Sequence, residues 1–233
     1  MTITAWDEPV GGTPRGTLVV LPGRGETAAS YERFGRRLSA DAYKVRLVPV
    51  ELDDLADTTD RVGKLLADES LPSPKVLVGA DTGATFAATI AAELPVDAVV
   101  LAGLALPGSA GVDSWEAELE ARTACPVHTR VIDQDAGFTR GALNDPLPWE
   151  SLDLTAPDKP VLVLHGSADA VTPPADAAAP YAEVPSARVR LIEGGRHDVL
   201  NDLAHRSVAA TIVLFLESLR LGPDLPDVVT ESP

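Results

Sequence analysis

Short apolar runs alternate along the chain with longer stretches in which apolar residues recur at helical spacing. The runs are rich in Val, Leu and Ile and predict buried strands at residues 17–21, 45–50, 75–79, 96–101, 161–165 and 188–192. The stretches between them predict helices at residues 27–40, 53–69, 82–94 and about 200–221. Strands separated by helices pair in parallel, and nearly continuous apolar strands are typical of a sheet covered on both faces. We therefore expect residues 1–233 to form a single α/β domain with a mostly parallel sheet.

Residues 105–158 break this alternation. A charged segment at 114–122 predicts a short helix, and the apolar residues at 127–132 predict a further strand. Long excursions in compact domains are often functional, so we interpret residues 105–158 as a short lid inserted over a pocket. The Pro-rich, acidic residues 222–233 predict a loose tail.

The excess of acidic over basic residues limits the classes of binding partner that we expect. Asp and Glu number 35 against 19 Lys and Arg, which gives a formal net charge of −16. Such a surface repels phosphate backbones, and no apolar run reaches the ~20 residues of a membrane span, so neither nucleic acid nor a membrane is expected as a partner. The single cysteine, Cys125, excludes an intrachain disulfide and a cysteine-based zinc site. We expect a cytoplasmic monomer or small homo-oligomer whose partner is a small-molecule substrate.

The loop after the strand at 75–79 carries the first candidate for chemistry. Asp81 lies between Gly79 and Gly83, where a strand passes into a helix. Small residues on both sides permit a sharp turn that lifts the middle side chain above the sheet, where a carboxylate can act as a covalent nucleophile. The alternative is that Asp81 only caps the following helix, a position that Asp favours.

Three other loops also follow the carboxyl ends of strands and therefore lie at the same edge. This is the edge at which open α/β sheets bind ligands. The Gly-rich loop around Arg24 can turn amide N–H groups toward a developing anion, or it is an ordinary strand-to-helix turn. Asp169 follows the strand at 161–165 and can accept a hydrogen bond from a histidine, or it is a turn residue. His197, in a Gly-rich loop after the last strand, is the best placed of the four histidines to act as a general base.

The order of these loops is that of the α/β-hydrolase superfamily, which the chain resembles over residues 17–104 and 160–221. Its four motifs resemble, in order, the oxyanion loop of small carboxylesterases, a nucleophile elbow, an acid loop and the histidine loop of esterases and lysophospholipases, and they read LPGRGE, VLVGADTG, VLVLHGSADAVTPP and GGRHDVLND. The resemblance implies that Asp81 is the nucleophile, Asp169 the acid and His197 the base. It also implies that the backbone amides of Arg24 and Thr82 are the oxyanion donors, with Gly23 as the oxyanion glycine.

Asp81 stands where most members have serine, and Pro22 where they have histidine. A carboxylate needs no base to attack an sp³ carbon that carries a leaving group or belongs to an epoxide. The product is an alkyl–enzyme ester, which water activated by His197 then hydrolyses. This scheme resembles the epoxide hydrolases and haloalkane dehalogenases.

The resemblance to those enzymes is incomplete, because Thr82 follows the nucleophile where a Trp is common. Halide binding needs two polarised N–H donors, for which Trp115 and Trp149 of the insertion are candidates. Epoxide opening needs phenols, for which Tyr31 is the candidate. The alternative for all three is an aromatic residue of the core or surface.

Three functions therefore stay open. The first is a hydrolase acting on an ester, lactone or epoxide through an Asp81 nucleophile. The second is a non-hydrolytic enzyme of the same fold, in which Asp81 and His197 act as acid and base in an elimination, isomerisation or cyclisation. The third is a non-catalytic binding protein. No motif for a nucleotide cofactor or metal is present in the sequence, so we expect neither.

Overall fold

The computed structural model describes residues 2–149, 151–152, 154 and 158–230. Seven strands form one sheet in the order β1-β3-β2-β4-β5-β6-β7. All neighbouring pairs are parallel except β1 and β3. The strands are β1 (Thr4–Trp6), β2 (Gly16–Leu21), β3 (Tyr43–Leu47), β4 (Lys75–Ala80), β5 (Ala98–Ala102), β6 (Val161–Gly166) and β7 (Ala187–Ile192).

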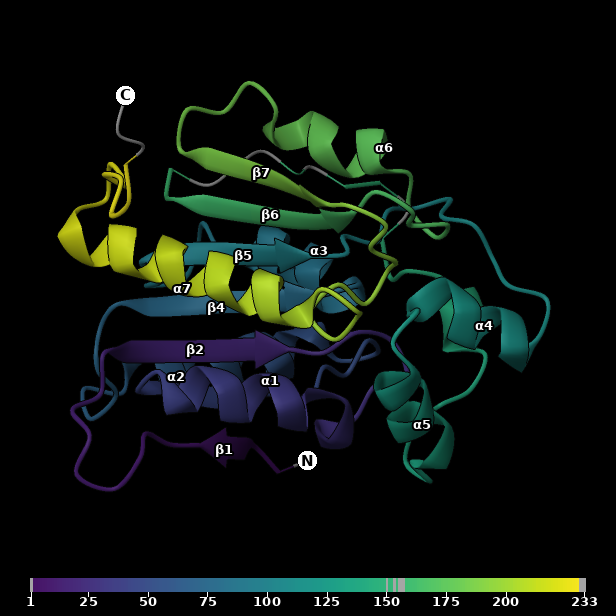
Figure 1. The fold of residues 1–233 in the computed structure, drawn as a ribbon, viewed down its shortest axis with the longest axis horizontal. Coiled ribbons are helices and arrows are strands. Elements are labelled where there is room, and N and C mark those ends of the chain that lie inside the picture. Colours follow the sequence, from purple (N-terminus) through teal and green to yellow (C-terminus); the bar gives the residue numbers. More distant parts are fainter. Residues whose placement is uncertain (1, 150, 153, 155–157, 231–233) are drawn as a thin grey trace.

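Helices cover both faces of the sheet. In Figure 1, α1 and α7 lie on one face and α2 and α3 on the other, while α4 and α5 stand beyond the ends of the strand arrows. The helices are α1 (Ala28–Ala40), α2 (Leu55–Ala67), α3 (Thr82–Ile90), α4 (Trp115–Arg122), α5 (Pro126–Gln134), α6 (Pro174–Ala178) and α7 (His205–Leu221), with 3₁₀ turns at Ala142–Asn144 and Ala179–Tyr181. The predicted α/β architecture is confirmed.

The central strands explain the two-sided core. Every residue of β2, β4, β5 and β6 is buried, as their continuous apolar sequences predict. Within β2, Leu18 and Val20 pack toward α1 and α7, whereas Val19 and Leu21 pack toward α2 and α3. This alternation fixes the register, because a shift by one residue exchanges the two faces.

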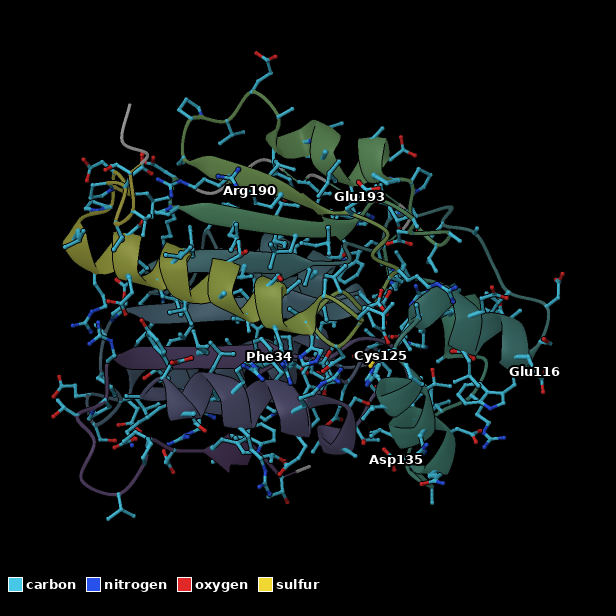
Figure 2. All side chains as sticks on the ribbon, in the orientation of Figure 1. Phe34, Glu116, Cys125, Asp135, Arg190 and Glu193 are labelled. Carbon is cyan, nitrogen blue, oxygen red and sulfur yellow. The ribbon has the colours of Figure 1, made fainter. Side chains whose placement is uncertain are left out.

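The insertion differs from the prediction in one element. Residues 127–132 were expected as a strand, but they lie within helix α5. Pro126 occupies its first turn, where proline is tolerated, and the buried residues His128 and Ile132 are four apart, which is helical spacing. Figure 2 shows Cys125 at the inner end of α5 and Glu116 on the outer side of α4.

Two further elements were not predicted. Strand β1 has three residues and pairs only with β3, so its sequence carries too little periodicity to be found. The five-residue helix α6 is equally short. Within the predicted tail, Leu225 is 5 % exposed and lies in the core beside α7. Residues 231–233 of the predicted tail lie outside the described residues.

No helix in the described part of the chain combines the length and apolar character needed to cross a membrane.

Candidate active site

Asp81 stands at a sharp bend between β4 and α3. Its φ of 48° and ψ of −122° lie in a region that side-chain-bearing residues rarely adopt. The bend is possible because glycines lie two residues before and two residues after Asp81. A Cβ at Gly83 would overlap the carbonyl oxygens of Leu21 and Pro22, and a Cβ at Gly79 would overlap Gly83. The sequence therefore folds into the predicted elbow, and the Asp81 side chain is held at the carboxyl edge of the sheet, 2 % exposed.

The carboxylate of Asp81 does not cap α3. Asp81 occupies the N-cap position, but its side chain accepts no hydrogen bond from a backbone N–H in the first turn of the helix. Instead, its Oδ2 accepts a hydrogen bond from the backbone N–H of Arg24 at 2.7 Å and one from the Thr82 hydroxyl at 3.1 Å. The alternative in which the side chain serves only as a helix cap is therefore wrong.

His197 lies between two carboxylates. Its Nε2 is 3.1 Å from Asp81 Oδ1, and its Nδ1 is 2.8 Å from Asp169 Oδ2. The backbone around His197 is fixed by α4, because the His197 N–H donates to the carbonyl of Ala121 at 3.2 Å. The structure thus brings together the three side chains from β4, β6 and β7 that the sequence order predicted.

Asp169 is fixed on all sides. Its Oδ1 accepts the backbone N–H groups of Val171 and Thr172 at 2.8 and 3.1 Å. Its Oδ2 faces His165 Nε2 at 2.9 Å in addition to His197. His165 is the last residue of the strand expected at 161–165, and the sequence gives no signal of its contact with the acid loop beyond its position four residues before Asp169.

The side chain of Arg24 is the largest addition to the predicted site. Its Nη2 donates to Asp81 Oδ1 at 2.7 Å and its Nε to Asp81 Oδ2 at 3.0 Å, so the guanidinium forms a two-pronged ion pair with the carboxylate. Its Nη1 donates to the carbonyls of Leu143 and Asp145 in the insertion, at 2.9 and 3.1 Å. Sequence analysis gave Arg24 only a backbone role, because nothing in the motif shows where a flexible side chain turns.

The charges of the site follow from these contacts. Burial alone would raise the pKa of Asp81, but the hydrogen bond from His197 and the charge of Arg24 hold this pKa well below its usual range. Burial opposes the charged form of His197, yet Asp169 and Asp81 outweigh it and raise the pKa of His197 to about 10. The pKa of Asp169 is lowered despite burial, chiefly by the charge of His197. At neutral pH the site therefore holds two carboxylates, one imidazolium and one guanidinium.

A second group of buried charges lies behind the site, and sequence analysis did not find it. Arg122 of α4 is completely buried; its Nη2 contacts Glu118 at 2.9 Å, and its Nη1 lies 3.6 Å from Asp198 and 3.9 Å from Glu26. Arg122 also donates to the carbonyl oxygen of Arg24 at 2.8 Å, which joins the two groups. Burial and the charge of Asp198 raise the pKa of Glu26 to about 7.

The same region contains the one set of described residues with metal-ligand proximity. Glu26, His128 and Asp198 each offer a ligand atom, all within 4.8 Å of one another. Arg122 already places a positive charge against both carboxylates of this set, at the distances given above. The arrangement therefore provides its own counter-charge.

Tyr31 and Gly23 support the loop before α1. The Gly23 N–H lies 2.8 Å from Glu26 Oε2 and 3.2 Å from the Tyr31 hydroxyl, which itself contacts Glu26. Gly23 must be a glycine, because a Cβ there would approach the Asp81 Cβ to 2.8 Å. The phenol of Tyr31 is therefore engaged beneath the loop, and its hydrogen-bond partners do not include Asp81.

The two tryptophans of the insertion lie in different surroundings. The indole N–H of Trp115 donates to Asp133 at 2.9 Å and its ring stacks with Arg140, so its contacts lie within the α4–α5 region and do not reach Asp81. Trp149 stacks on Phe86 of α3 with ring centroids 6.4 Å apart. Of the two, only Trp149 lines a cleft that Arg24 also lines.

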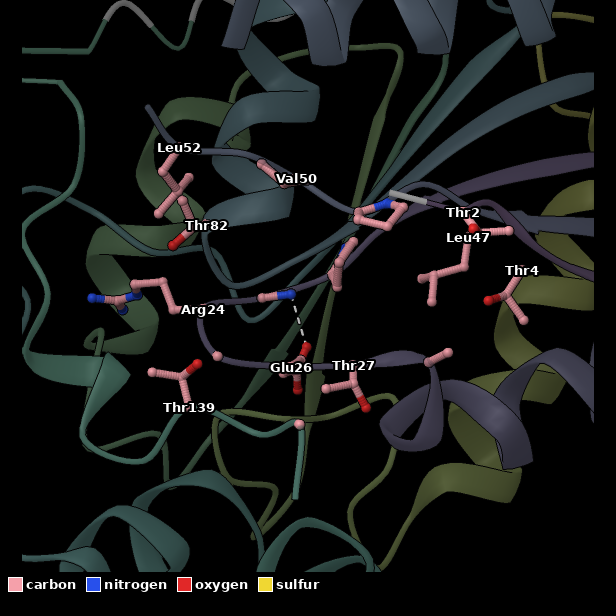
Figure 3. Close-up of a pocket in the computed structure, with 16 residues that line it drawn as sticks. Thr2, Thr4, Arg24, Glu26, Thr27, Leu47, Val50, Leu52, Thr82 and Thr139 are labelled. Atoms are coloured by element: carbon pink, nitrogen blue, oxygen red, sulfur yellow. Dashed lines mark hydrogen bonds between the residues drawn. The ribbon is translucent and has the colours of Figure 1, made fainter. Parts of the chain in front are cut away.

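Two clefts meet at Arg24. One, of about 470 Å³, is drawn in Figure 3, where Arg24, Glu26 and Thr82 contribute to its walls. The other, of about 540 Å³, lies under the insertion and has a mixed wall, lined besides Arg24 by the apolar Leu106, Pro107, Leu143, Pro146, Leu147 and Trp149 and the polar Ser109, Asn144 and Asp145. Both volumes are in the range of small-molecule sites. Asp81 borders neither, so the Arg24 guanidinium separates the carboxylate from both clefts.

The comparisons with known proteins agree with this fold. Residues 151–204, which include Asp169 and His197, match the family model described as serine aminopeptidase, S33. No curated protein matches the chain.

Among solved structures, the monoacylglycerol lipase of Paleococcus ferrophilus superposes with a TM-score of 0.74 at 18 % identity, covering 94 % of this chain and 100 % of that one. The monoglyceride lipase of Saccharomyces cerevisiae, a soluble variant in complex with a substrate analogue, gives 0.73 at 16 % identity, covering 93 % and 91 %. The esterase RhEst1 from Rhodococcus sp. gives 0.64 at 21 % identity, covering 93 % and 95 %.

The chain therefore has the α/β-hydrolase fold, and the resemblance inferred from its motifs is confirmed at that level. The family match and the lipase and esterase neighbours together support an α/β-fold hydrolase. The description of the family model names a serine enzyme, but its match does not extend to the elbow, where this chain has Asp81.

Proposed function

We propose that the protein is a hydrolase in which Asp81 attacks an sp³ carbon of a small organic substrate and His197 then activates water. The proposal rests on the different contacts of the two carboxylate oxygens of Asp81. Oδ2 lies against the Arg24 amide, and Oδ1 lies 3.1 Å from His197 Nε2. One oxygen is thus placed to become an ester carbonyl, and the other is placed beside the base.

In the first step, Oδ1 bonds to the substrate carbon and the bond from that carbon to its leaving group breaks. Because the raised pKa of His197 keeps it protonated, its Nε2–H can protonate a leaving oxygen. The step ends with an alkyl ester on Asp81, a neutral His197 and, for an epoxide, a hydroxyl on the adjacent carbon.

The second step uses the charge change that the first produces. Once Asp81 is esterified, its negative charge no longer raises the pKa of His197, while Arg24 stays nearby. His197, oriented by Asp169, takes a proton from water, and the hydroxide adds to Cγ of Asp81. The resulting oxyanion on Oδ2 is stabilised by the Arg24 N–H and the Thr82 hydroxyl. Release of the alcohol restores ionised Asp81 and protonated His197.

The test is a trapping experiment. The variant His197→Gln retains a side chain that cannot accept the proton of water, so an adduct should accumulate on the peptide containing Asp81, with the mass of the whole substrate for an epoxide and of the alkyl group alone for a haloalkane. Single turnover of the wild-type chain in ¹⁸O water should label the same peptide. A panel of epoxides, haloalkanes, lactones and aryl esters that leaves this peptide unmodified and unlabelled would refute the proposal.

A second candidate rests on the same ion pair. Protonated His197 beside ionised Asp81 is also an acid and a base in a single buried site, as an elimination, isomerisation or cyclisation requires. A product with no added water and no adduct in His197→Gln would favour this function. If Asp81→Asn leaves ligand affinity unchanged and no turnover is found in either form, a binding protein is favoured instead.

A further inference from the structure

We propose that the guanidinium of Arg24 is a catalytic group that binds the leaving oxygen of the substrate, and that the site is therefore selective for small epoxides. This inference rests on the proposed function of Asp81. It assigns to the Arg24 side chain a role separate from that of its backbone amide.

The first argument is the placement of the guanidinium over the reacting oxygen. Arg24 Nη2 lies 2.7 Å from Asp81 Oδ1, the oxygen that also faces His197. Because both donors occupy Oδ1, a substrate carbon reaches this oxygen only if one of them moves aside. His197 is held at both ring nitrogens and is 1 % exposed, whereas Arg24 borders both clefts. Arg24 is therefore the donor that yields to the substrate.

The second argument is that the guanidinium keeps its anchor when it yields. Its two Nη1 hydrogens bond to the carbonyls of Leu143 and Asp145, independently of Asp81. Of its five N–H groups, one on Nη2 has no partner among the described residues. Attack from Oδ1 places the leaving oxygen on the far side of the carbon. A guanidinium displaced outward into the clefts meets the oxygen there.

The third argument is the position of the other donors. The Tyr31 hydroxyl is engaged with Glu26 and Gly23, and the Trp115 N–H with Asp133. The aromatic donors considered for this task are thus occupied, except Trp149, whose ring packs on Phe86. A permanently charged guanidinium is suited to the charge that develops on an alkoxide.

The substrate class follows from the cleft under the insertion. Leu106, Leu147 and Trp149 form an apolar part of its wall and Ser109, Asn144 and Asp145 a polar part, while Arg24 is the cationic group that lines it. When the C–O bond of an epoxide breaks, its electron pair stays on oxygen and is stabilised by Arg24 until His197, or solvent water in the His197→Gln variant, supplies the proton. No other reactant is needed, and the later water completes a diol.

The experiment measures how fast Asp81 is alkylated in the His197→Gln background, where each adduct accumulates and is counted by mass spectrometry. Two probes share one skeleton, styrene oxide and 2-phenylethyl bromide, because bromide needs less stabilisation as it leaves. Arg24→Ala and Arg24→Lys are compared with Arg36→Ala, whose arginine is exposed on α1. Thermal unfolding of each variant confirms that it is folded, and Arg24→Lys preserves the charge if Arg24→Ala does not fold.

We expect Arg24→Ala to slow alkylation by styrene oxide on the order of 10²-fold, the effect of removing one oxyanion donor. Alkylation by the bromide should fall by less than about tenfold, since the donor matters less there. Arg24→Lys should lie between, added ethylguanidinium should restore part of the epoxide rate of Arg24→Ala, and Arg36→Ala should match the parent. Equal losses with both probes and no rescue, or no loss at all, overturn the role of Arg24 while leaving the Asp81 nucleophile intact. The absence of any adduct in the parent variant overturns both.

Discussion

The molecule contains two buried arginines, Arg24 and Arg122, and they differ in what surrounds them. Arg24 pairs with a single carboxylate, that of Asp81, which His197 also neutralises. Arg122 lies among Glu118, Asp198 and Glu26, and among the described residues the only other basic side chain near this group is His128, whose Nε2 is 3.4 Å from Asp198. Arg24 borders two clefts, whereas Arg122 is completely enclosed.

This contrast distinguishes an arginine suited to a reacting centre from an arginine suited to a structural role. A charge whose partner has a second counter-ion and lies next to open space can be displaced at moderate cost. A charge that alone balances several buried carboxylates cannot, because its removal leaves uncompensated charge in a low-dielectric interior. The first arrangement suits a reacting centre, and the second fixes the loops that carry Arg24 and His197.

The comparison is tested most strongly at Asp81. Asp81→Asn keeps the shape of the side chain but removes the nucleophilic charge, so turnover should fall by at least about 10³-fold, as for other residues that form covalent intermediates. Steady-state kinetics with a substrate from the trapping panel measures the loss. Turnover within a few-fold of wild type would show that Arg24 does not face a reacting group.

Exchanging the two arginines for methionine should separate stability from activity. Arg122→Met should lower the free energy of unfolding by about 3–5 kcal/mol, because the buried acidic side chains around it lose the cation that they share. Arg24→Met should cost less stability, since His197 still pairs with Asp81, but should reduce activity more. Urea unfolding and the activity of the folded fraction measure both effects, and equal stability losses would contradict the distinction.

The pH dependence of stability tests whether His197, beside Asp81, carries a positive charge. The pKa of His197 is raised to about 10 in the folded state, above its ordinary value of 6.5. Its stabilising contribution is therefore fully present below pH 6.5 and is lost as the pH rises toward 10. The midpoint of thermal unfolding should fall over this interval, and the fall should be shallower in His197→Gln. Parallel profiles for the two chains would show that His197 does not carry this charge.

The smallest effect is expected at Tyr31, which supports the loop without facing Asp81. Tyr31→Phe removes the hydroxyl that contacts Gly23 and Glu26, so stability should fall by about 1 kcal/mol, the net value of one hydrogen bond. Turnover should change by less than about threefold. A loss of turnover comparable to that of Asp81→Asn would instead return Tyr31 to the reacting groups.

Much of the fold could be predicted from the sequence because its signals are local. The buried strands are continuous apolar runs, and the elbow requires glycines at 79 and 83, which the sequence displays directly. The strand expected at 127–132 was wrong because three apolar residues among six, Val127, Val131 and Ile132, are too few to distinguish a strand from a helix, and Pro126 favours the start of a helix there. Strand β1 depends on its partner β3 more than on its own three residues.

The positions of Asp81, Asp169 and His197 at one edge could be predicted because parallel strands end together. The roles of long side chains could not. The guanidinium groups of Arg24 and Arg122 lie at the ends of long, flexible side chains. Some of their partners are far away in the sequence: Asp81 for Arg24, and Glu26 for Arg122. No pattern along the sequence records such contacts, since they arise only when the loops are packed.

The bend at residue 81 has a consequence for laboratory evolution of this scaffold. Its backbone is fixed by the close approach of Gly83 to the carbonyls of Leu21 and Pro22, not by the identity of the side chain it carries. A library randomised at position 81 therefore samples different reacting atoms presented to the same imidazole. A library randomised at 79 or 83 samples mostly chains that do not fold. New chemistry at this site is therefore accessible by changing position 81, but not by changing the glycines two residues before and after it.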